Sequence, residues 1–206
     1  FNQIAVQPAV GITFASILRN ILRQDPDIIM IGEMRDLETA ENAVQAALTG
    51  HLVLSTLHTN DAASSITRLL DLGVPSFLIK ATLVGIVAQR LVKKICPDCR
   101  ESFEMDSSEL ETLGLDLGKK GPVTLQRGRG CLKCRGTGYF GRSGIYEVLP
   151  VTESIQTLIS RETDIRKIRD TAVQEGMVTL RENAVKRLLD GTTTYQEVLR
   201  VTWEQL

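Results

Sequence analysis

The sequence predicts an α/β fold in which a parallel sheet is flanked by helices. Two short apolar stretches, residues 28–31 and 51–55, each run into a polar turn, and a segment with helical periodicity follows each turn. Strands that alternate with helices are typical of a parallel sheet with right-handed crossovers. Because residues 28–31 are continuously apolar rather than alternating, we expect this strand to be covered on both faces.

Capping residues mark the ends of the helices in this part of the chain. Asp36 can cap a helix over residues 37–49, and Gly50 suits the left-handed position at its end. Asp61 can likewise cap a helix over residues 62–72. The sequence therefore predicts strand, helix, strand and helix in this order.

Composition and charge exclude several classes of function. The chain has 206 residues, 43% of them hydrophobic, which suits one or two globular domains. A formal net charge of -1 offers no general surface for nucleic acid or an acidic membrane.

The longest apolar run, residues 83–88, is too short to span a bilayer, and no secretory segment precedes the first strand, so we expect a cytoplasmic protein. The start at Phe1, without a methionine, indicates a piece of a longer protein.

Glu33 and His58 are the candidate catalytic residues. Glu33 comes soon after the first strand, and His58 lies in the polar turn after the second. Ligands collect at the carboxyl ends of parallel strands, so we expect both side chains at one edge of the sheet. A carboxylate placed there can orient an attacking water or hold a metal ion. The alternative is that Glu33 belongs to a solvated turn that only caps the next helix.

Arg19 and Arg23 form a second candidate group. They lie four residues apart on the polar side of a stretch with helical periodicity. No acidic residue lies three or four positions from Arg19, and Arg23 has only Asp27, which is beyond the break at Pro26. Guanidinium groups without a partner in their own helix suit an external anion such as a phosphate. The alternative is a pair of solvated surface arginines.

The four cysteines predict a metal centre. They form two CxxC pairs, Cys96 with Cys99 and Cys131 with Cys134, and no cysteine is left over. Each pair can direct two thiolates to one ion, and four thiolates form the closed tetrahedral set of a structural Zn²⁺. The alternative is two disulfides, which rarely persist in the reducing compartment expected here.

We expect three parts along the chain. Residues 1–95 hold the two strands and the candidate catalytic residues, and residues 96–150 hold the four cysteines. Residues 151–206 have helical character, with capping boxes that begin at Thr179 and Thr194, so we expect a small bundle of about four helices.

Two segments carry a resemblance to a known family. Residues 18–40 read LRNILRQDPDIIMIGEMRDLETA, and residues 49–60 read TGHLVLSTLHTN. These segments closely resemble the secretion ATPase superfamily, and within it the motors of type II secretion (general secretory pathway protein E) and of type IV pilus assembly. The four cysteines and the helical tail also match these motors, whereas pilus retraction motors of the superfamily lack the cysteines. The resemblance covers essentially the whole chain.

The resemblance implies a fold and roles for the candidate residues. Residues 1–95 would be the carboxyl-terminal part of a RecA-like P-loop NTPase core. Gly32 stands where such enzymes usually have a metal-binding aspartate, Glu33 polarises the attacking water, and His58 lies near the γ-phosphate. The two arginines, Arg19 and Arg23, match residues that reach the nucleotide of a neighbouring subunit in a homo-hexamer.

The resemblance also implies cofactors and partners. These are ATP and Mg²⁺ beside the structural Zn²⁺, and the inner-membrane platform proteins of a secretion or pilus system, which would hold the motor at the cytoplasmic face of the membrane. No nucleic acid is expected. One part of the family pattern is absent, because these residues contain no G-x-x-x-x-G-K-[ST] loop to cradle the phosphates and no acidic box between that loop and the first strand. We therefore expect the chain by itself to be inactive as an ATPase.

The sequence favours the carboxyl-terminal portion of an ATPase that drives type II secretion, with type IV pilus assembly as the alternative. A function of another class is a zinc-organised interaction module without catalysis, whose helical tail docks a membrane-anchored partner. A zinc-ribbon nucleic-acid binder is disfavoured, because few aromatic residues accompany the basic residues around the cysteines, namely Phe103, Tyr139 and Phe140.

Overall fold

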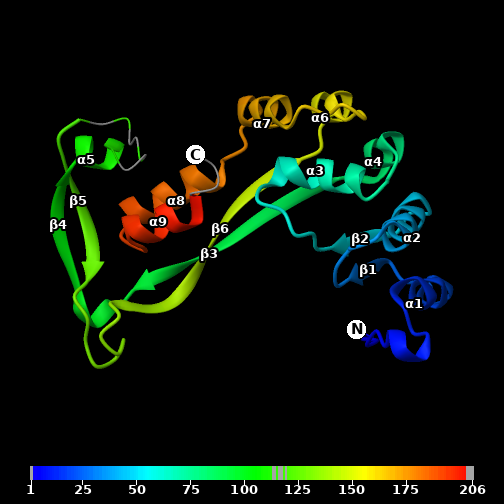
Figure 1. The fold of residues 1–206 in the computed structure, drawn as a ribbon, viewed down its shortest axis with the longest axis horizontal. Coiled ribbons are helices and arrows are strands. Elements are labelled where there is room, and N and C mark those ends of the chain that lie inside the picture. Colours follow the sequence, from blue (N-terminus) through cyan, green and yellow to red (C-terminus); the bar gives the residue numbers. More distant parts are fainter. Residues whose placement is uncertain (1, 113–114, 116–117, 119, 203–206) are drawn as a thin grey trace. The chain divides into compact units, whose positions relative to one another are not determined.

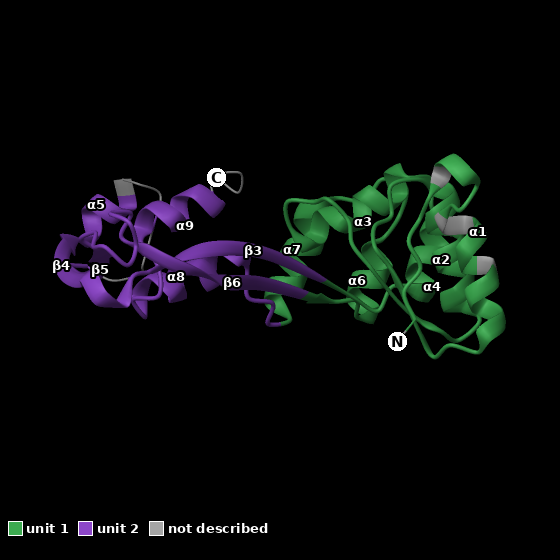
Figure 2. Ribbon diagram, turned by 90° about the horizontal axis from the view of Figure 1, so that it is seen from below, with its two compact units in different colours: residues 1–86, 149–175 green, residues 87–148, 176–206 purple. Residues whose placement is uncertain are grey.

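A computed structural model of the chain describes residues 2–112, 115, 118 and 120–202, without the side chains of residues 8, 14, 15 and 19 (Figure 1). The chain forms two compact units (Figure 2). The first unit contains residues 1–86 and 149–175, and the second contains residues 87–148 and 176–206. Each unit therefore combines segments that are far apart in the sequence.

Helices dominate the first unit. Its elements are η1 (Pro8–Val10), α1 (Phe14–Ile21), η2 (Leu22–Gln24), β1 (Ile28–Ile31), α2 (Leu37–Leu48), β2 (Leu52–Ser55), α3 (Ala62–Asp71), α4 (Ser76–Thr82), α6 (Glu153–Leu158) and α7 (Ile165–Gln174), where η marks a 3-10 helix. Strand, helix, strand and helix follow one another in β1, α2, β2 and α3, as the sequence predicts. The side chains of Asp36 and Asp61 cap α2 and α3, and both caps were predicted.

The pair β1 and β2 is parallel, with Ile29 opposite Val53. One face of this pair is part of a hydrophobic core with α1 and α2, which contains Leu18, Ile29, Ile31, Ala43 and Ala46, with Ile21, Leu22, Met34 and Val53 packed against it. The other face is exposed in the described part of the chain, where Met30 has 73% of its surface accessible and Leu54 has 49%. The expectation that both faces of the first strand are covered is therefore wrong for this chain. Successive strand side chains alternate between the faces, and α1 and α2 pack on only one of them.

The second unit contains both strands and helices. Its elements are η3 (Pro97–Cys99), β4 (Arg100–Asp106), α5 (Ser107–Thr112), β5 (Pro122–Gly128), α8 (Leu180–Leu189) and α9 (Tyr195–Thr202). β4 and β5 form an antiparallel pair. Two longer strands, β3 (Gly85–Ile95) and β6 (Tyr139–Pro150), form a further pair, and the division between the two units falls within both of them.

Four helices follow Thr152 in the residues up to 202 that the structure describes, which is about the expected number, but they are divided between the two units. Helices α6 and α7 belong to the first unit, and α8 and α9 belong to the second. The compact units thus do not follow the division at residues 95 and 150, which stays a prediction about sequence modules. Among the described helices, none has both the length and the apolar character needed to cross a membrane.

Candidate functional site

Glu33 lies in the turn after β1, and the structure brings His58 to it from the turn after β2. The Nε2 atom of His58 is 2.9 Å from Oε1 of Glu33. The Glu33 side chain is 19% exposed, whereas the His58 side chain is 87% exposed. The two residues share one edge of the parallel pair, as strand order predicts. Their catalytic roles stay a prediction at this point.

Arg35 is a further partner of Glu33 that the sequence did not single out. One of its terminal nitrogens, Nη2, is 2.6 Å from Oε2 of Glu33. The hydrogen bond from Arg35 lowers the pKa of the Glu33 carboxyl, and the charges of Arg35 and His58 act in the same direction, while burial opposes them. The Glu33 side chain is therefore ionised at neutral pH and can accept a hydrogen bond from water or bind a cation.

Backbone contacts hold the turns after the two strands together. The Thr56 hydroxyl donates to the carbonyl oxygen of Gly32 at 2.6 Å. The Met34 amide donates in turn to the carbonyl oxygen of Thr56 at 3.1 Å. Gly32, the residue before Glu33, is thus hydrogen-bonded to the turn that carries His58. These bonds hold the backbone on both sides of the contact between Glu33 and His58.

The structure places Arg19 and Arg23 in different elements. Arg19 lies in α1, which ends at Ile21, and Arg23 lies in the 3-10 turn η2 that follows. Arg23 is exposed and has no ion-pair partner among the described residues. The Arg19 side chain lies outside the described part of the structure. The anion site predicted for Arg19 and Arg23 therefore stays a prediction.

The loop that carries His58 leads into the first turn of α3, which side-chain hydrogen bonds cap. The Asp61 side chain accepts a hydrogen bond from the Ser64 amide at 2.7 Å, and the Ser64 side chain bonds back to the Asp61 amide. A second oxygen of Asp61 contacts the guanidinium of Arg169 from α7. The cap at Asp61 could be predicted from the sequence, but the contact with Arg169 could not, because 108 residues separate the two.

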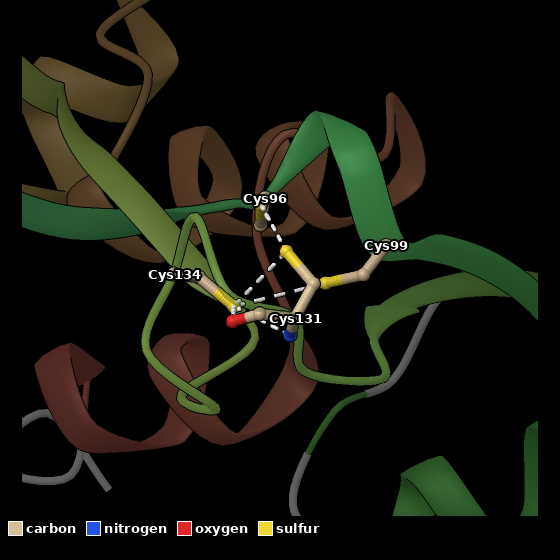
Figure 3. A group of neighbouring side chains, drawn as sticks. All are labelled: Cys96, Cys99, Cys131 and Cys134. Carbon is tan, nitrogen blue, oxygen red and sulfur yellow. Dashed lines mark hydrogen bonds between the residues drawn. The ribbon is translucent and has the colours of Figure 1, made fainter.

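The four cysteines meet in the second unit, as predicted (Figure 3). All four sulfur atoms lie within 4.8 Å of one another. The closest pairs are 3.7 Å, 3.8 Å and 3.9 Å apart. Sulfurs about 2.3 Å from a central zinc ion form a tetrahedron with edges of about 3.8 Å, so the cluster fits this metal. A disulfide needs about 2.05 Å between sulfurs, and the cysteines are free.

Backbone amides point at two of the thiols. Gly130 donates to Cys99 at 3.2 Å, and the amides of Cys131 and Gly138 donate to Cys134 at 3.1 Å and 3.3 Å. Burial raises the pKa of Cys99 to about 12. Burial also opposes ionisation of Cys134, but its two amide donors and the neighbouring thiols lower its pKa to about 6. A divalent cation would neutralise the thiolates that the remaining cysteines form when they lose their protons.

Glycines allow the chain to wrap closely around the cysteines. A Cβ atom on Gly128 would lie 2.0 Å from the carbonyl oxygen of Gly138. A Cβ atom on Gly130 would lie 2.9 Å from that of Gly136, and the φ angle of Gly130 is 97°. Larger residues do not fit at these positions, which explains the glycine-rich sequence around the second CxxC pair.

The fold and the two sites define an α/β protein with a carboxylate and a histidine at one strand edge and a separate tetrathiol centre. The chain belongs to the type II/IV secretion system protein family, whose model matches residues 1–200. This finding confirms the resemblance drawn from residues 18–40 and 49–60.

Several curated proteins are similar to the chain over almost its whole length. Type II secretion system protein E of Pseudomonas aeruginosa is 48% identical over 99% of this chain. Type II secretion system ATPase E of Vibrio cholerae is 48% identical over 98% of it, and type IV pilus assembly ATPase PilB of Thermus thermophilus is 49% identical over 98%. The chain spans 40%, 40% and 23% of the length of these relatives.

Solved structures share the fold. The pilus retraction motor PilT, solved with bound ADP, superposes with a TM-score of 0.62 and 31% identity over 93% of this chain and 44% of its own. The ATPase DotB of Legionella pneumophila gives a TM-score of 0.63 over 93% of this chain and 42% of its own, and at 22% identity it supports the fold alone. The α/β fold class is therefore confirmed.

Proposed function

We propose that this chain is the carboxyl-terminal part of a hexameric ATPase motor that drives type II protein secretion through pseudopilus assembly. The observation that carries the proposal is the Glu33 carboxylate, which the strand edge presents beside His58 in a chain of the secretion family. The full-length motor hydrolyses ATP to ADP and phosphate. Its core is RecA-like, and the described α/β unit is one portion of it.

The residues at the strand edge divide the chemistry. Glu33, which is ionised at neutral pH, orients the attacking water and accepts its proton. His58, which contacts Glu33, donates a hydrogen bond near the γ-phosphate, and its exposure leaves the imidazole accessible to the nucleotide. Gly32 supplies only backbone at the position where related enzymes use a metal-binding aspartate. Mg²⁺ bound with ATP neutralises charge on the phosphates when the nucleotide is present.

Arginines complete the site from a neighbouring subunit. Arg23 is exposed and has no ion-pair partner in the described chain, which suits a guanidinium that meets phosphate across an interface. Arg19, one helical turn earlier, acts with it. The site thus depends on a homo-hexamer, and each subunit presents Glu33 and His58 to its own nucleotide.

Two observations support a longer protein around this chain. The described residues include no glycine-lysine loop for the phosphates, so the chain alone is expected neither to bind ATP tightly nor to hydrolyse it. The bare face of β1 and β2, with Ile28 60% and Met30 73% exposed, is of a kind that proteins normally cover. We propose that a segment bearing the phosphate loop packs beside this face.

The cysteine cluster holds a structural Zn²⁺ in this proposal. Cys96, Cys99, Cys131 and Cys134 fill all four positions, so the ion has no open site for substrate. The metal orders the second unit and takes no part in hydrolysis. The motor itself works on the cytoplasmic face of the inner membrane, bound to platform proteins of the secretion system, and does not bind nucleic acid.

Type IV pilus assembly is the alternative function. Relatives from both systems have nearly the same identity to this chain, 48% and 49%, so similarity favours neither. A zinc-organised interaction module without catalysis is the alternative of another class. The cysteine cluster, whose ligands all come from this chain, favours this alternative. It does not explain why Glu33 and His58 are in contact at the strand edge.

Steady-state ATP hydrolysis by the full-length protein that carries this chain tests the proposal. Glu33→Gln should lower turnover roughly 10²- to 10⁴-fold, because it removes the general base. Glu41→Gln is the matched control, since Glu41 is an exposed carboxylate on α2. Hydrolysis that is unaffected by Glu33→Gln, or a wild-type protein without hydrolysis, would favour the interaction module.

A further inference from the structure

The start of α3 is built around Asp61, whose side chain is 8% exposed. One carboxylate oxygen caps the helix through the Ser64 amide. The Ser65 hydroxyl bonds to the Asp61 carbonyl oxygen at 3.3 Å and lies 2.8 Å from the Thr59 hydroxyl. Residues 59–65 are therefore tied to one another, and His58 is the next residue before them.

Arg169 brings α7 to this helix start. Its guanidinium contacts the carboxylate oxygen of Asp61 that the helix cap does not use, so the two partners occupy different oxygens. Helices α3 and α7 pack together within the first unit, where Ile168 and Ala172 of α7 are buried. Arg169 is 36% exposed at the side chain, whereas Asp61 is nearly enclosed. The charge of Asp61 thus has a specific partner from a remote part of the chain.

The cap at α3 does not need this partner. Asparagine caps helices about as well as aspartate does, and one side-chain oxygen is sufficient. The second carboxylate oxygen therefore connects this helix start to Arg169 of α7 in addition to the cap. The His58 side chain is 87% exposed, so its reach toward Glu33 depends on the position of its own backbone. A misplacement of about 1 Å at a catalytic group can reduce a rate about 100-fold.

We propose that Arg169 is a positioning residue that acts through Asp61 to hold His58 against Glu33. This inference rests on the proposed ATPase function for its catalytic consequence, but not for its structural one. Movement of α7 relative to α3 would change the distance between His58 and Glu33 without any contact between α7 and the nucleotide. Helix α7 is thereby linked to the strand edge within the first unit.

Histidine NMR signals test the structural part directly. The chain contains only two histidines, His51 and His58, so the imidazole signals are simple to assign. His51 bonds to the carbonyl oxygen of Ala46 at 2.9 Å and serves as an internal reference. Arg169→Gln and Asp61→Asn should each shift the His58 signals and leave those of His51 unchanged. The control Arg166→Gln, on the exposed side of α7 with Asp164 as its partner, should shift neither.

A shift at neither histidine, or equal shifts at both, would contradict the inference. Asp61→Asn keeps the helix cap and therefore separates loss of the ion pair from loss of the helix start. Circular dichroism of each variant establishes that the fold is retained. If Arg169→Gln does not fold, Asp61→Asn still gives a decisive result, because it removes the same charge contact from the other side.

Hydrolysis by the full-length protein tests the catalytic part. Arg169→Gln should lower kcat about 10- to 100-fold at an unchanged KM for ATP, because Arg169 does not touch the nucleotide. Arg169→Lys should recover part of this loss. The double variant with Asp61→Asn should lose no more than the single one, since both act through one contact. Full activity of Arg169→Gln in a protein whose hydrolysis depends on Glu33 would overturn this inference alone, whereas hydrolysis independent of Glu33 would overturn the proposed function.

Discussion

The strand edge and the cysteine cluster differ in how much of each site the chain itself supplies. At the cysteine cluster, four ligand atoms lie within 4.8 Å of one another, backbone amides point at two of them, and glycines allow the close wrapping. At the strand edge, one carboxylate and one largely exposed histidine are in contact, and the adjacent sheet face is exposed in the described part of the chain.

This difference separates a closed site from an open one. A structural metal centre needs every ligand from the chain that it stabilises, because its binding energy is also folding energy. A nucleotide site in a multi-subunit motor is assembled from several segments and subunits, so one segment by itself presents isolated functional groups. Variants at the first site should change folding, and variants at the second should change mainly turnover.

The largest effect is expected at the closed site. Cys96→Ser should abolish zinc binding, because it removes one of the four thiolates. The effect should be the largest because structural zinc contributes roughly 10–16 kcal/mol of apparent binding energy in small zinc domains. Elemental analysis should show the metal-to-chain ratio fall to near zero. Hydrogen exchange should accelerate at Gly130 and Gly138 in the second unit and stay unchanged in α2.

Leu132→Ala is the matched control for the cysteine variant. Leu132 lies between Cys131 and Cys134 and is 99% exposed, so its truncation should leave the zinc content unchanged. A wild-type chain that is purified without chelator and contains no zinc would refute the tetrathiolate site.

A smaller effect, confined to turnover, is expected from the arginines. Arg23→Ala in the full-length protein should lower ATP hydrolysis roughly 10²- to 10³-fold, the usual loss when one group that stabilises transition-state charge is removed. Arg19→Ala should act in the same direction. Zinc content should not change in either variant. The exposed residue Arg161 provides the control Arg161→Ala, and activity equal to that control would end the idea of arginines acting across an interface.

A modest effect on stability is expected at the turn between Glu33 and α2. Asp36 accepts a hydrogen bond from the Thr39 amide at 2.8 Å and caps the helix. Asp36→Ala should lower the free energy of unfolding by about 1 kcal/mol, whereas Asp36→Asn should change it little. Urea denaturation of the two variants measures the difference. Equal stabilities would mean that this cap does not define the start of α2.

The smallest effect is expected from the ion pair between the exposed Arg35 and the half-buried Glu33. The folded state lowers the pKa of Glu33 below its ordinary value of 4.5, chiefly through the hydrogen bond from Arg35. The folded protein therefore binds fewer protons here than the unfolded chain, and this stabilisation is present above about pH 4.5 and lost as the pH falls through the lower folded pKa. Arg35→Ala should raise the pKa of Glu33, as measured by carboxyl NMR titration. No change in the variant would show that the pair does not persist in solution.

Much of the first unit follows from local sequence. The apolar run before Glu33, the caps at Asp36 and Asp61, and the glycine at residue 50 act over a few residues, and each predicted an element that the structure contains. The cysteine cluster was predictable for a similar reason, because two CxxC pairs with no remainder leave few arrangements.

Other features depend on contacts that no local pattern encodes. The contact between Asp61 and Arg169 joins positions 108 residues apart, and the same long-range packing brings α6 and α7 into the first unit. A continuous apolar strand predicts burial on both faces but cannot show that the described chain covers only one. Arg35 gave no distinct signal, since a charged residue in a turn after a strand is usually solvated.

Comparison of ATP turnover by the purified 206-residue chain and by the full-length protein that carries it tests the central claim most directly. The strand edge is proposed to be half of an active site. The account predicts no turnover by the chain alone and Glu33-dependent turnover by the full-length protein, with equal zinc content in both. Turnover by the chain alone that Glu33→Gln abolishes would contradict it.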